Sequence, residues 1–131
     1  MFKIFEDLTI EDVPEVVISE IIKELNSDPT SYNNTFLYIL NSMDSAINEA
    51  KKGKVLANSS IDVILTFVIS AKTIMEVIKH YGAAIKVAHS EIESIKLNCS
   101  SIINAFEIIK ELQSDNLKDL EPEELLQVLT T

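Results

Sequence analysis

Residues 85–109 read IKVAHSEIESIKLNCSSIINAFEII and place an apolar side chain at alternating intervals of three and four residues. Such spacing returns to one face of an α-helix at every step, here over almost four heptads. The pattern predicts a helix over 83–113, which the weak helix formers at 98–101 could bend or interrupt. The apolar positions are Ile85, Ala88, Ile92, Ile95, Cys99, Ile102, Phe106 and Ile109.

Residues that break helices are scarce on either side of this stretch. The chain has two glycines, Gly53 and Gly82, and no proline lies between Pro29 and Pro122. We therefore predict an all-α fold, a helical bundle of four main helices plus a short C-terminal helix over 122–129. The whole chain, residues 1–131, is expected to form one domain, since 131 residues without a long linker match the usual domain size.

The helix boundaries follow from local capping signals. The first helix is expected to begin at Asp12, with Asp12 and Glu15 forming an acidic capping box and Pro14 in the first turn. The second is expected to run from Pro29, capped by Asp28, to a stop at Gly53. Residues 1–10 fit a short strand, a helical turn or an arm across the bundle equally well.

The third helix, expected from Ser59 or Ser60 to Tyr81, is apolar on most of its circumference. A helix of this kind lies in the middle of a bundle or carries a surface for a partner. We expect the central position, and we expect the 85–109 seam to pack within the bundle.

The net charge of −10 is unevenly placed. Eight acids and two lysines give residues 1–28 a charge of −6, residues 29–113 are neutral, and five acids and one lysine give residues 114–131 a charge of −4. All eleven basic residues are lysines. Without a basic face or arginine, direct binding to nucleic acid or to an anionic membrane is not expected.

Composition also indicates the cellular location of the protein and the kind of genome that encodes it. The single cysteine cannot form an intrachain disulfide, the N-terminus lacks an apolar export signal, and no run is long enough to span a bilayer. We therefore expect a cytoplasmic protein. The richness in Ile, Lys and Asn is typical of an AT-rich bacterial, viral or phage genome, and a viral source would place the protein in the host-cell cytoplasm.

No residue pattern assembles a catalytic or cofactor site. His89 lies where a phosphotransfer histidine would lie on a long helix, but Ile92 and Glu93 are not the lysine and glycine usual after it. His80 is expected to be structural near a helix end, and Cys99 a small buried apolar residue. The two histidines lack the spacing of a helical metal pair. We expect no enzymatic activity, no cofactor and no metal.

The leading hypothesis is a small acidic module that binds another protein, as an inhibitor, immunity factor, adaptor or chaperone. Acidic surfaces steer basic partners, so a basic protein is the expected target. One alternative is a homodimer or larger homo-oligomer that assembles through the 85–109 seam, and a second is a phosphotransfer protein that uses His89. The expected partner-binding residues are Glu6, Asp7, Glu11, Asp12 and Glu15, followed by Asp119, Glu121, Glu123 and Glu124.

Overall fold

A computed structural model describes residues 8–118, with side chains described for 8–57 and 60–114. Its elements are η1 (Ile10–Asp12), α2 (Glu15–Ser27), α3 (Pro29–Lys51), α4 (Asn58–Tyr81), η2 (Gly82–Ala84) and α5 (His89–Lys118). Within these residues every regular element is helical, so the all-α prediction is confirmed. The helix expected over 122–129 lies outside the described residues.

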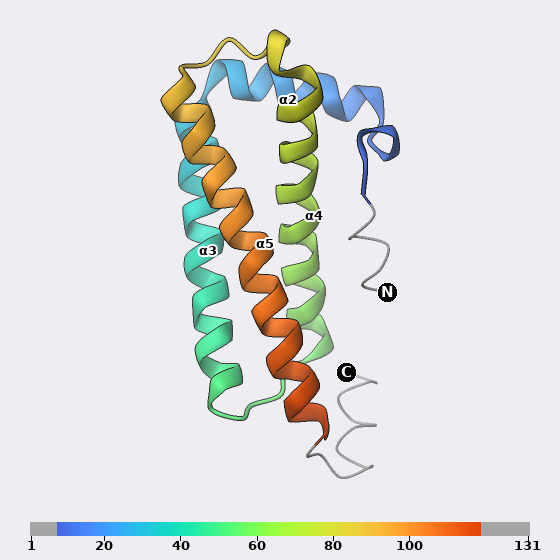
Figure 1. The fold of residues 1–131 in the computed structure, drawn as a ribbon, viewed down its shortest axis with the longest axis vertical. Coiled ribbons are helices and arrows are strands. Elements are labelled where there is room, and N and C mark those ends of the chain that lie inside the picture. The colour runs from blue at the N-terminus through green and yellow to red at the C-terminus, as the bar shows by residue number, and fades with distance from the viewer. Residues whose placement is uncertain (1–7, 119–131) are drawn as a thin grey trace.

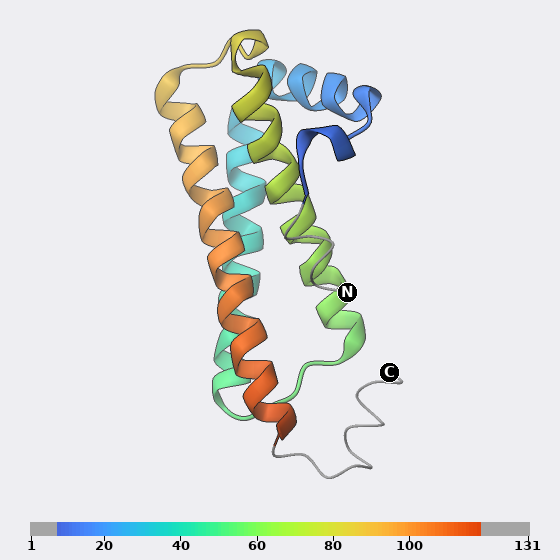
Figure 2. The same cartoon turned by 45° about the vertical axis from the view of Figure 1, so that its right-hand side comes forward.

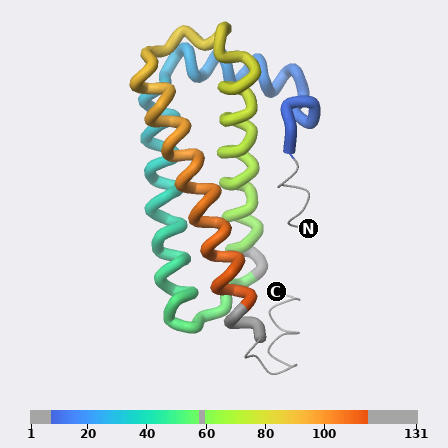
Figure 3. Tube along the Cα trace, viewed as in Figure 1, coloured from blue at the N-terminus to red at the C-terminus, as the bar shows by residue number. Residues whose placement is uncertain are grey.

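Three long helices lie side by side, and the shorter α2 crosses one end of them (Figure 1). Helices α3 and α5 run in the same direction and α4 runs in the opposite direction, which the second view also shows (Figure 2). The trace in Figure 3 places the α3–α4 linker at the end opposite α2. We call the α2 end the upper end and the linker end the lower end.

Helix α3 begins and ends where its local signals predict. The Asp28 side chain accepts a hydrogen bond from the Ser31 N–H at 3.1 Å, and Pro29 occupies the first turn. Gly53 follows the helix with a φ of +86°, a left-handed conformation that residues with a Cβ rarely adopt. These features confirm that α3 lies between Pro29 and the Gly53 turn.

The capping box expected between Asp12 and Glu15 is wrong. The Asp12 carboxylate instead accepts a hydrogen bond from the Thr9 backbone N–H at 3.0 Å, which caps the N-terminus of the short helix η1. Val13 is then extended, as residues before proline prefer, and α2 begins only at Glu15. Of the ambiguous first ten residues, Leu8 and Thr9 are irregular and Ile10 opens η1.

The helix expected over 83–113 does not start at Ala83. It corresponds to α5, which begins at His89. The Asn26 side chain accepts from the Lys86 N–H at 2.7 Å and donates to the Ala84 carbonyl at 3.1 Å. This pair of bonds holds the α4–α5 linker in a non-helical path. Residues 98–101 do not interrupt α5, which is continuous to Lys118.

The apolar seam of α5 lies inside the bundle, as expected. The seam positions from Ile95 to Ile109 are buried, and α5 packs extensively against both α3 and α4. The earlier seam positions differ, because Ile92 is half-buried and Ile85 and the exposed Ala88 precede the helix. Helix α4 contacts η1, α2, α3, η2 and α5, which accounts for part of its apolar surface. Its contact with α3 is slight, however, and the most extensive packing joins α3 to α5. The buried seam residues are Ile95, Cys99, Ile102, Phe106 and Ile109.

The two glycines provide a matched test of the backbone. We expect Gly53→Ala to destabilise the protein by about 1 kcal/mol, because alanine is strained at a positive φ. Gly82→Ala should be neutral or stabilising by up to about 1 kcal/mol, since Gly82 is right-handed and an added Cβ meets no atom within 4 Å. Urea unfolding of both variants measures the difference, and equal effects would contradict the turn assignment.

Candidate functional site

An open hollow lies beneath α2, where α3 and α4 diverge. It has a volume of about 610 Å³ and is walled by side chains from all three helices. We call it the upper groove. Its apolar lining residues are Val17, Ile21, Phe36, Ile39, Phe67, Ile69 and Ile74.

The α4 wall of the upper groove also carries three hydroxyl groups. Each donates its proton to the carbonyl four residues earlier in α4: Thr66 to Asp62 at 3.0 Å, Ser70 to Thr66 at 3.0 Å, and Thr73 to Ile69 at 2.7 Å. A hydroxyl whose proton is used in this way retains only acceptor capacity toward the groove. These oxygens therefore favour a ligand that brings hydrogen-bond donors.

Tyr32 and Glu24 complete the polar part of the upper groove. The Tyr32 hydroxyl donates to Glu24 Oε2 at 2.5 Å. Burial, and then the hydrogen bond to the Glu24 carboxylate, raise the pKa of Tyr32, so its donor is retained and its proton is directed at Glu24. Glu20 lies one turn before Glu24 on the exposed side of α2 and lines the adjoining hollow with it. Lys23 and Asp28 line this hollow as well, so three acids face one lysine and the edge formed by α2 is acidic overall.

The expected N-terminal binding residues are only partly described. Glu11, Asp12 and Glu15 are exposed, on η1 and the first turn of α2. Asp12 is engaged by Thr9, so its carboxylate already has a local partner. The remaining expected residues, Glu6, Asp7, Asp119, Glu121, Glu123 and Glu124, lie outside the described residues.

Sequence reasoning did not single out Glu20 and Glu24. Their spacing of four residues places them on one side of α2, beside Val17 and Ile21. This helical pattern was available in the sequence. Their proximity to α3 and α4 was not, because it depends on where α2 crosses the bundle.

Each of the two histidines lies near a single glutamate of its own helix. His89 is the exposed first residue of α5, at the end of the bundle and not on the middle of a long helix, and its Nε2 lies 3.9 Å from Glu93 Oε1. His80 Nε2 pairs with Glu76 Oε2 at 3.1 Å on the last turns of α4. Among residues 8–118, no cluster of three or more His, Cys, Asp or Glu side chains is arranged to hold a metal ion.

Comparison with protein-family models, with curated proteins and with solved structures finds no match for this chain. In the part of the chain that the structure describes, no helix has both the length and the apolar character that crossing a bilayer requires.

Cys99 tests whether the interior of α5 is accessible to reagents. The side chain is fully buried, as expected, and burial raises the pKa of its thiol to about 12. We expect a thiol reagent at pH 8 to label the native protein at least ~100-fold more slowly than the urea-unfolded chain, because the thiolate is the reactive form. Rapid stoichiometric labelling of the native protein would contradict the buried position.

Proposed function

We propose that this protein is a non-enzymatic module that binds a basic segment of another protein in the upper groove. The observation that carries the proposal is the combination of an apolar floor with polar groups that accept hydrogen bonds at its walls and edge. Lysine and arginine side chains have long apolar stems and donor-rich heads, so they match such a surface.

A helix is the segment that fits this surface best. The groove runs between two long helices, and an amphipathic helix presents apolar side chains at intervals of three and four residues to such a groove. The acids at its α2 edge would meet basic residues on the flank of the incoming helix. Glu11 and Glu15 lie at the same end of the bundle and would add long-range attraction.

This proposal keeps the broader hypothesis of an inhibitor, immunity factor, adaptor or chaperone that acts in the cytoplasm on a basic protein. Two alternatives have less support. The 85–109 seam is buried from Ile95 to Ile109, so assembly through it would require α5 to leave its own bundle. A phosphoryl group on His89 would meet the Glu93 carboxylate one turn along, which repels it.

The experiment selects ligands from a display library of random 14-residue helical peptides, with the full-length chain as bait. We expect enriched peptides to combine apolar residues at helical spacing with lysine or arginine. Their affinity should fall about tenfold in the double variant Glu20→Gln/Glu24→Gln, which corresponds to a loss of ~1.4 kcal/mol. The expected loss reflects two carboxylates that no longer attract the basic flank.

Two further pairs of acids have the same spacing and serve as comparisons. Glu11→Gln/Glu15→Gln should mainly slow association and reduce its dependence on salt, because these acids lie outside the groove. Glu107→Gln/Glu111→Gln, on α5, should leave binding unchanged. Enrichment without basic residues, or equal effects of the α2 and α5 pairs, would overturn the proposal.

A further inference from the structure

A second hollow continues from the upper groove toward the lower end of the bundle. It lies between α3 and α4, has a volume of about 490 Å³, and shares Phe67 with the upper groove. We call it the lower groove. Its apolar lining residues are Met43, Ala46, Leu56, Val63, Ile64 and Phe67.

The lower groove is open because no described element lies over it. Helix α2 crosses only the upper end of the bundle (Figures 1 and 2). Helices α3 and α4 make few contacts with each other, so apolar side chains on both remain accessible between them. Val63 on α4 is 52% exposed. Covering such a surface with apolar side chains is favourable.

The described part of the chain ends close to this groove. Gln113 of α5 accepts the Leu56 N–H at 2.8 Å and donates to the Lys54 carbonyl at 3.3 Å. Leu56 itself lines the groove. Gln113 therefore attaches α5 to the groove's lower edge, and α5 ends at Lys118 at the same end of the bundle (Figure 1).

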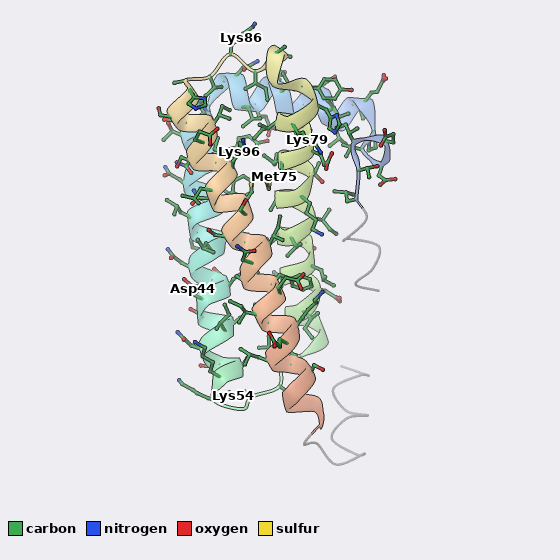
Figure 4. The ribbon with its side chains drawn as sticks, in the orientation of Figure 1. Asp44, Lys54, Met75, Lys79, Lys86 and Lys96 are labelled. Carbon is green, nitrogen blue, oxygen red and sulfur yellow. The ribbon has the colours of Figure 1, made fainter. Side chains whose placement is uncertain are left out.

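Residues 119–131, which follow α5, combine leucines with acids and so match an apolar groove that has lysines at its end. Residues 119–131 read DLEPEELLQVLTT, with Leu125, Leu126 and Leu129 following a run of acids. The α3–α4 linker, where the groove begins, carries Lys52 and Lys54, and Lys54 projects at the lower end of the bundle (Figure 4). Both lysines pair with Glu49, so this end combines two positive charges with one negative charge. The acidic run and the basic linker are therefore complementary in charge.

The lengths also agree. The groove-lining part of α3, residues 42–49, spans about 12 Å at 1.5 Å per residue. The segment 119–131 has thirteen residues and can reach up to about 43 Å when extended. The segment is therefore long enough to reach the whole length of the lower groove from the end of α5.

We propose that the acidic, leucine-rich segment 119–131 of the same chain occupies the lower groove, with its leucines against Met43, Val63 and Ile64. The segment would complete the bundle on the side that α5 leaves open. This inference does not rest on the function proposed above, which concerns the upper groove and a different molecule.

Methyl-resolved NMR of the full-length chain tests this contact directly. We expect nuclear Overhauser effects between the Leu126 methyls and those of Met43 and Val63. Val63→Asp should remove these signals and shift the Leu125 and Leu129 methyls. The matched control is Ile108→Asp, which places the same charge at a similarly exposed residue of α5, 45% accessible, and should leave them in place.

A second variant changes the C-terminal segment instead of the groove, so the described core stays intact. Leu125→Ser/Leu126→Ser alters no described core residue, and it should shift the Met43 and Ile64 methyls while the Ile102 methyls stay unchanged. Absence of the contacts in the parent protein would overturn the inference, as would equal effects of the two aspartate variants. Contacts that disappear on dilution would assign the groove to a second copy of the chain and overturn it as well.

Discussion

The structure depends on the burial of the α5 seam against α3 and α4. Ile95, Cys99, Ile102, Phe106 and Ile109 are buried there, and each large aliphatic side chain removed from water contributes about 1.5–3 kcal/mol. The seam fixes α3 and α5 as parallel neighbours and holds the antiparallel α4 against α5. It also leaves one side open. Helix α2 has 13 residues, or about 20 Å, while α3 has 23 and α4 has 24, or about 35 Å each. Helix α2 also lies across the upper end of the bundle, so most of the length of the α3–α4 face is left uncovered by it (Figures 1 and 2).

Three side-chain amide arrangements fix how these helices are joined. Asn26 holds the α4–α5 linker and Gln113 holds the α3–α4 linker, each through one donated and one accepted bond. Between α3 and α5, buried Asn98 donates to the Asn33 side chain, and Asn33 donates to Ser94 Oγ at 2.9 Å. A buried polar group without a partner costs about 1–3 kcal/mol, so sliding α5 by one turn would be penalised at this point. These bonds therefore fix the register of α5 against α3 and the paths of both linkers.

The features that the sequence predicts correctly depend on interactions between residues that are close in the sequence. Asp28, Pro29 and Gly53 set the ends of α3 through bonds and torsion angles within a few residues, and the 85–109 spacing identifies the buried side of α5. The two wrong helix starts have different causes. One is a competing interaction within a few residues, and the other is an interaction between residues far apart in the sequence. Asp12 bonds to Thr9 before it can cap α2, and α5 starts late because Asn26, 60 residues earlier, captures Lys86. The acidic edge at Glu20 and Glu24 is readable as a helix face, but its role beside the upper groove depends on the crossing of α2, which no local pattern specifies.

The central claim is that the seam of α5, and not its outer face, forms the interior of a single chain. Urea unfolding of Ile102→Ala and Leu97→Ala, at two protein concentrations, tests it most directly, since Ile102 is fully buried and Leu97 is 67% exposed. The account predicts that Ile102→Ala lowers the free energy of unfolding by about 2–5 kcal/mol, and Leu97→Ala by less than ~0.5 kcal/mol, independently of concentration. Similar losses in the two variants, or a loss that depends on protein concentration, would contradict it.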